Sequence, residues 1–154
     1  MIATLPKKFE YTGDVPLFGE VPVMKLTPVI NGVMLYELEN NSLIGQIFFS
    51  PKERSATVSI AEESTFIVKN NGNEFSVEPF EGQKLSSRYV IFGNCRKNAY
   101  SVYEYADGKT QPVEAVKVTE NPAQEIRYSA WFAEGSNVVK NLLIVVAING
   151  IING

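Results

Sequence analysis

The chain has 154 residues, of which 45% are hydrophobic and 20% are charged, and its formal charge is -3; this composition describes one globular domain and excludes wholesale disorder. It contains no histidine and a single cysteine, Cys95, which excludes Ser-His and Cys-His nucleophiles, the usual zinc ligand sets and an internal disulfide. The basic residues occur singly or in pairs and form no stripe along successive phosphates, so we predict no nucleic-acid partner.

Residues 1–28 are expected to form an extended arm outside a single globular domain of residues 29–154. Prolines recur along this segment at Pro6, Pro16, Pro22 and Pro28. Each one fixes φ, removes an amide donor and pushes the preceding residue towards extended geometry, so a helix is excluded there. We predict that the arm docks on a partner, and its candidate contact residues are Pro16, Leu17, Phe18, Pro22 and Val23.

From Val29 onward, short apolar or alternating runs are separated by turn residues, which predicts an antiparallel all-β domain of about ten strands. Asn31-Gly32 supplies the positive φ values of a two-residue hairpin turn between strands at 28–30 and 33–36. Pro28 restricts the first of these strands to an edge. The other strands are predicted at 43–49, 56–60, 65–69, 74–78, 88–92, 100–105, 113–118 and 126–132.

These strands predict a β-sandwich, for which a jelly roll is one arrangement. Its inner faces are expected to carry the apolar side chains that alternate along the strands. They are Leu35, Ile47, Phe49, Val58, Ile60, Phe66, Val68, Phe75, Val77, Ile91, Ile126, Tyr128 and Phe132, with Ile144 and Val146 beneath them.

The run from Val138 to Ile148 is the most apolar segment of the chain. Its length and β-branched residues favour a strand that is buried on both faces, and the alternative is a buried helix. It is shorter than the ~20 apolar residues of a membrane helix. No apolar signal-peptide core follows the first lysines, so we predict neither a signal peptide nor a transmembrane helix.

The residues offer little chemistry, and we predict no enzyme activity, no catalytic residues, no metal and no cofactor. Glu37 and Glu39 alternate on one predicted strand, which is the minimal arrangement of a glycosidase pair, but two solvated glutamates are the simpler interpretation. Cys95 precedes Arg96 and Lys97, which can activate a thiol, whereas an incidental thiol is the alternative. Asp14 and Asp107 are the only aspartates, which excludes an aspartate-rich calcium loop.

Aromatic residues are the remaining candidates for binding. Tyr103 and Tyr105 share one face of their predicted strand, and Arg127 and Trp131 share one face of theirs. If the opposite faces point inward, these four residues form an exposed aromatic face that suits a sugar ring or a protein surface. The alternative is that Trp131 belongs to the core.

The predicted arm lacks sheet partners of its own, and the C-terminal segment is very apolar. A neighbouring molecule could supply strand pairing for the arm and an apolar surface for the C-terminal segment. In this respect the chain resembles small viral structural proteins, such as capsid decoration, head-fibre and tail proteins of phages. We therefore expect a structural or assembly protein of a virion that docks on copies of itself or on a larger protein assembly such as a capsid. The alternative is a β-sandwich module that binds carbohydrate or protein through its aromatic face, located in the cytoplasm.

Overall fold

The computed structural model describes residues 1–9, 13–61, 65–85 and 87–153. These residues form two antiparallel sheets and one α-helix, which confirms the prediction of a mostly β, sandwich-like protein. The strands are β1 (Ile2–Pro6), β2 (Val15–Leu17), β3 (Met24–Val29), β4 (Gly32–Glu37), β5 (Leu43–Ser50), β6 (Ser55–Ile60), β7 (Thr65–Asn70), β8 (Phe75–Pro79), β9 (Ser87–Asn94), β10 (Ala99–Ala106), β11 (Val113–Glu120) and β12 (Arg127–Phe132). Two short 3-10 helices connect strands within hairpins: η1 (Pro51–Glu53) joins β5 to β6, and η2 (Cys95–Lys97) joins β9 to β10.

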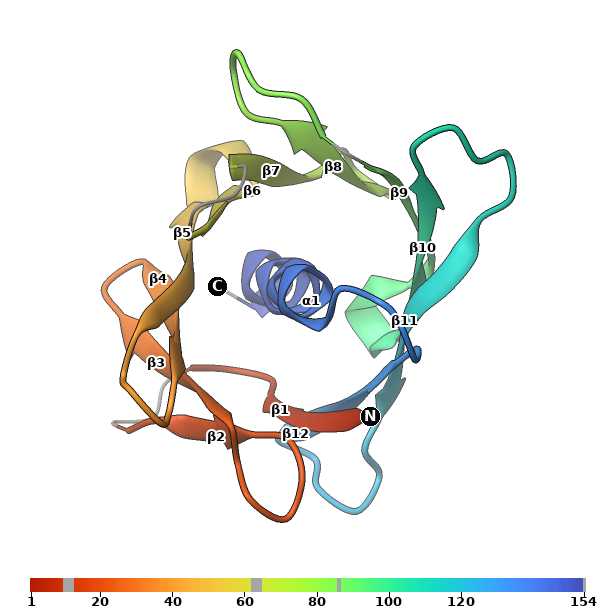
Figure 1. The fold of residues 1–154 in the computed structure, drawn as a ribbon. Coiled ribbons are helices and arrows are strands. Elements are labelled where there is room, and N and C mark those ends of the chain that lie inside the picture. Colours follow the sequence, from red (N-terminus) through yellow and green to blue (C-terminus); the bar gives the residue numbers. More distant parts are fainter. Residues whose placement is uncertain (10–12, 62–64, 86, 154) are drawn as a thin grey trace.

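The two sheets curve around a central helix, α1 (Val138–Asn153), as Figure 1 shows. One sheet has five strands in the order β1-β12-β11-β10-β9, and the other has seven strands in the order β2 to β8. The sheets approach each other where β8 contacts β9 and where β1 contacts β2. The helix occupies the space that the sheets enclose (Figure 1), where it contacts β5, β6 and β7 of one sheet and β11 and β12 of the other.

The C-terminal segment is this helix, so the prediction of a buried strand over 138–148 was wrong. Asn137 caps the first turn, because its side-chain oxygen accepts a hydrogen bond from the Lys140 amide at 3.1 Å. Every residue from Lys140 to Asn149 is buried, and a helix that is apolar on all sides suits a site that is enclosed on all sides. The propensity cost of β-branched residues in a helix is only tenths of a kcal/mol each, roughly, and burial outweighs it.

The N-terminal segment does not lie outside the domain, which corrects the expectation of a separate arm. β1 pairs with β12 from Ile2 opposite Trp131 to Pro6 opposite Arg127, and β2 pairs with β3. Residue 28 therefore falls within a strand and not at a domain boundary. The buried apolar residues of the N-terminal segment, such as Leu5, Leu17 and Leu26, belong to the same core as the rest of the fold.

The first predicted hairpin is present, but its turn is displaced by one residue. Val29 lies opposite Gly32, so Ile30 and Asn31 form the turn, and Asn31 adopts φ 58°. Gly32 belongs to β4, where a Cβ atom would collide with the backbone carbonyl of Ile47. Pro28 is tolerated in β3, because the pairing of β2 with β3 ends at Leu26 and the missing amide faces no ladder.

Nearly all of the predicted inner-face residues are buried or half-buried. The exception is Ile126, which precedes β12 and is 57% exposed, so its assignment to the core was wrong. The seven-stranded sheet approaches α1 closely at Gly45 of β5. A Cβ atom there would lie 2.8 Å from Cδ1 of Leu143 and 3.0 Å from the Ser59 carbonyl oxygen.

A charged group is also enclosed near the start of α1. The Lys140 ammonium lies 5.2 Å from the centre of the Tyr89 ring and 5.9 Å from that of Phe66, within the range of cation-π attraction. The described ranges contain no helix with the length and apolar character needed to cross a bilayer.

Candidate functional site: the outer face of the five-stranded sheet

The outer surface of the five-stranded sheet carries the two most exposed aromatic residues of the described ranges, Phe92 and Trp131. A single row crosses all five strands, because Ile2 lies opposite Trp131, Trp131 opposite Lys117, and the row continues through Ser101 to Phe92. Five strands at ~4.8 Å spacing make this row roughly 19 Å wide. We name the outer aromatic face by its residues: Ile2, Val90, Phe92, Tyr103, Tyr105, Lys117 and Trp131.

Trp131 is on the surface, with 52% of its area exposed. Its neighbours along β12, Ala130 and Phe132, are buried, as the alternation of a strand requires. The alternative that placed Trp131 in the core was therefore wrong. Phe92 is still more exposed, at 73%, so two large aromatic side chains mark the two sides of this face.

The predicted residues Tyr103 and Tyr105 also point to the outer face but do not touch Trp131. Val90 lies opposite Tyr103, and the Arg88 guanidinium stacks over the Tyr105 ring at 4.3 Å. β11 lies between β10 and β12, with Glu114 opposite Tyr103 and Lys117 opposite Trp131. Arg127 is half-buried at the other end of β12.

Sequence reasoning missed Ile2, Val90, Phe92 and Lys117. The alternation within 88–92 places Val90 and Phe92 on one face, but only the pairing of β9 with β10 shows that this face adjoins Tyr103. Ile2 was assigned to an arm, so its position beside Trp131 was not foreseen.

A β-bulge leaves two opposite charges on the same face of β11. Val102 pairs with Val116 and the next residue, Tyr103, pairs with Glu114, so Ala115 is the extra residue. Ala115 and Val116 are both buried, which leaves Glu114 and Lys117 exposed on the outer side. Glu114 accepts a hydrogen bond from the Ser101 hydroxyl at 2.7 Å.

The predicted docking residues of the N-terminal segment are divided between core and surface. Leu17 and Phe18 are buried, and the Phe18 ring meets the Phe132 ring edge-on with 5.7 Å between centroids. Pro16, Pro22 and Val23 are exposed. The buried pair cannot contact a partner, because that would require opening the core.

The remaining chemical candidates gain no support from their surroundings. Burial raises the pKa of the Cys95 thiol to about 11, so it stays protonated at neutral pH and a reactive thiolate is disfavoured. Glu39 is exposed, as expected for a solvated glutamate, and Glu37 is half-buried. Over the described ranges, histidine, cysteine and carboxylate groups nowhere gather in a set of three or more that a metal would need.

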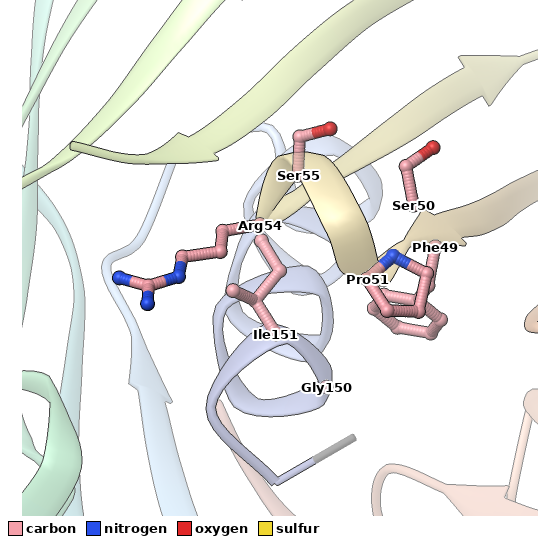
Figure 2. A pocket seen from close by; sticks show the side chains of 7 residues that line it. All are labelled: Phe49, Ser50, Pro51, Arg54, Ser55, Gly150 and Ile151. Atoms are coloured by element: carbon pink, nitrogen blue, oxygen red, sulfur yellow. The ribbon is translucent and has the colours of Figure 1, made fainter. Parts of the chain in front are cut away.

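A second feature lies at the C-terminal end of α1. A hollow of about 70 Å³ is lined by Phe49, Arg54, Gly150 and neighbouring residues (Figure 2). Phe49 and Gly150 also line a larger cavity of about 330 Å³ that reaches Lys7 and Lys8. Phe49 lines both spaces, and its ring occupies the place where a side chain on Gly150 would lie.

Comparison with known proteins identifies a shared fold but no family. No family model matches the chain, and no curated protein matches it. Among solved structures, the protein AT5G01750 of Arabidopsis thaliana aligns with 95% of this chain and 89% of its own, with a TM-score of 0.56 and 10% identity. At this identity the likeness concerns the fold alone.

Proposed function

We propose that this protein is a non-enzymatic assembly protein whose copies pair through the outer aromatic face. The observation that carries the proposal is the exposure of Trp131 and Phe92 on the same outer sheet surface. Exposed aromatic residues among aliphatic neighbours are typical of protein interfaces, where their burial supplies most of the binding energy. Ile2 and Val90, 40% and 41% exposed, extend the apolar area around them.

The charges on this face suit a second copy of the same chain. Glu114 and Lys117 lie on one strand, separated by the bulge. In a two-fold symmetric pair, the same patch meets itself in reverse, so Lys117 of each copy can face Glu114 of the other. Such a pair of charge contacts would set the register of an interface whose affinity comes from the aromatic residues.

A protein partner suits this face better than a sugar does. Sugar sites combine an aromatic platform with several converging polar groups, whereas the nearest neighbours of Trp131 across the sheet are Ile2 and Lys117. Leu17, Phe18 and most of α1 are buried within the fold, so they cannot be the docking surface, whereas Ile2 of the N-terminal segment belongs to the outer aromatic face. Membership of a virion stays a prediction that rests on the sequence.

The test is the mass in solution, measured by light scattering on a sizing column. The unmodified chain is expected at about twice its monomer mass of 17.1 kDa. Trp131→Ser combined with Phe92→Ser should give the monomer, because the two aromatic anchors are lost. Phe48→Ser, at an aromatic residue that is 42% exposed on β5 of the other sheet, is the matched control and should leave the mass unchanged.

A charge exchange tests the two-fold arrangement separately. Lys117→Glu should weaken pairing, since like charges would then face each other, and adding Glu114→Lys should restore it. A chain that stays at 17.1 kDa up to high micromolar concentration would refute self-pairing. A dimer that survives loss of both aromatic residues would place the interface elsewhere.

A further inference from the structure

The cavity at the C-terminal end of α1 has a size and an apolar lining that suit a small molecule. Its volume of about 330 Å³ lies at the lower end of the roughly 300–1,000 Å³ that is common for ligand sites. It opens between the end of β1, the β3–β4 turn and the last turn of the helix, and Phe9, Val29 and Phe49 form its apolar walls. These walls would bury an aromatic ring or a short aliphatic chain.

The charged groups of the lining are basic. Lys7 and Lys8 both line the cavity, and the remaining polar lining consists of asparagines. The Lys7 ammonium lies 3.5 Å from the Glu120 carboxylate, which engages one of its three N–H donors and leaves it able to donate to a second acceptor. Donors of this kind recognise an anionic oxygen.

The C-terminal end of α1 faces the cavity through Asn149, Gly150 and Asn153. Final-turn carbonyl groups give a helix end a partial negative charge, which opposes an anion. The Asn153 side chain donates to the Asn149 carbonyl at 3.0 Å and is thereby held against the helix. Lys7 and Lys8 line the same cavity, and their positive charges act against the partial charge of the helix end.

The floor of the cavity is held in place by buried contacts. Asn149 is 2% exposed, and its side chain donates a hydrogen bond of 2.7 Å to the Lys7 carbonyl, which ties α1 to the residue after β1. The Phe49 ring rests directly against Gly150. A site whose walls are fixed in advance loses little entropy when a ligand enters.

We propose that this cavity binds a small organic anion, in which one carboxylate or sulfonate is attached to an aromatic or short aliphatic body. The anionic group lies against Lys7 and Lys8, and the apolar body lies between Val29 and Phe49. The site shares no residue with the outer aromatic face, so it is independent of the proposed function.

The experiment compares two dyes that share one aromatic body. 1-Anilinonaphthalene-8-sulfonate carries the anionic group, and N-phenyl-1-naphthylamine lacks it. Titrations are made in the Trp131→Ser, Phe92→Ser background, which removes the competing aromatic surface. The sulfonate dye is expected to bind one molecule per chain, at least tenfold tighter than the neutral dye, and to shift the amide resonances of Asn31 and Gly150.

Two variants separate the polar from the apolar part of the site. Lys7→Gln with Lys8→Gln should weaken the sulfonate dye about tenfold and leave the neutral dye within about twofold, equivalent to ~1.4 kcal/mol for the anionic contact. Val29→Asp should weaken both dyes, and the sulfonate more. Lys84→Gln with Lys109→Gln, which alters two exposed lysines outside the cavity, is the control for net charge.

Equal affinity for the two dyes, or a lysine variant that binds like the control, would overturn the anion assignment. Binding that Val29→Asp leaves unchanged, or shifts confined to other residues, would overturn the site itself, as would the absence of binding at millimolar dye.

Discussion

The helix α1 meets the two sheets in different ways. Towards the seven-stranded sheet, it makes two close contacts at glycines, because Gly45 lies against Leu143 and Gly150 lies against Phe49. On the inner face of the five-stranded sheet, Tyr100 and Tyr128 are buried, and their hydroxyls have no hydrogen-bond partner among the described residues. On the side of the seven-stranded sheet, the fit of side chains against the two glycines is close. On the side of the five-stranded sheet, two hydroxyl groups are buried without adding a hydrogen bond among the described residues. Small changes on the two sides should therefore have opposite signs.

The largest effect is expected from Gly45→Ala. Its methyl group would lie 2.8 Å from Leu143 and 3.0 Å from a backbone carbonyl that cannot easily move. We expect the free energy of unfolding to fall by about 3 kcal/mol, in the upper range for an overpacked core. Chemical denaturation measures this change.

The double variant Gly45→Ala, Leu143→Ala is the control for this prediction. Leu143→Ala alone should cost about 2–5 kcal/mol through the cavity that it leaves. Combined with Gly45→Ala, the total loss should be smaller than the sum, because the new methyl group occupies part of that cavity. If the loss in free energy of unfolding of the double variant equals the sum of the two single losses, Gly45 and Leu143 do not restrict each other's packing.

Gly150→Ala is expected to have a smaller effect, of about 1–2 kcal/mol, since the half-buried Phe49 ring can move aside at some cost. The sign should reverse when the ring is absent. In a Phe49→Ala background, Gly150→Ala should stabilise the protein by up to ~1 kcal/mol, because alanine favours the helix over glycine. Thermal unfolding of the four chains decides the matter, and a loss in both backgrounds would contradict the proposed contact.

On the other side of α1, Tyr128→Phe should stabilise the protein by about 1 kcal/mol. The change removes a hydroxyl that is buried without a partner and leaves the ring in place. Tyr36→Phe, at a half-buried tyrosine on the seven-stranded sheet, is the control and should change little. A clear loss of stability in Tyr128→Phe would reveal a hydrogen bond to a buried water.

The last effect, which is absent at neutral pH, concerns the pH dependence of stability. Burial raises the pKa of Cys95 from 9.0 to about 11, and it also raises the pKa of Tyr100 and Tyr128. The folded state therefore holds these protons more tightly than the unfolded state does, and their contribution is complete below pH 9 and is lost as pH rises towards 11. Denaturant midpoints between pH 8 and 11 should fall, and less steeply in Cys95→Ala. An equal slope in the variant would mean that the thiol does not take part.

Most of the strands follow from local features of the sequence. The pairs 65–69 with 74–78 and 100–105 with 113–118 are joined by turns rich in asparagine, aspartate and glycine, and both pairs are present as β7–β8 and β10–β11. The side-chain alternation along 126–132 also placed Trp131 on the opposite face from Tyr128. These features depend on neighbours in the chain, so they can be recognised without the fold.

The candidate site was only partly predictable, because the sequence does not show which strands pair with each other. Alternation shows which residues share a face of one strand, but not which strand lies beside it. Trp131 meets Ile2 across 129 positions of sequence, and Phe92 joins the same row because the register of β9 on β10 puts it opposite Ser101. Register between distant strands is set by the whole core and is not written in any local pattern.

By itself, the amino-acid sequence determined the strand segments, most of the inward-facing residues and the absence of histidine chemistry, because composition, alternation and turn residues act over short distances. The tertiary structure alone decided that the run after Val138 is a helix and that residues 1–28 belong to the sheets. A run that is apolar on every side satisfies a buried strand and a buried helix equally well, and only the space enclosed by the two sheets selects between them.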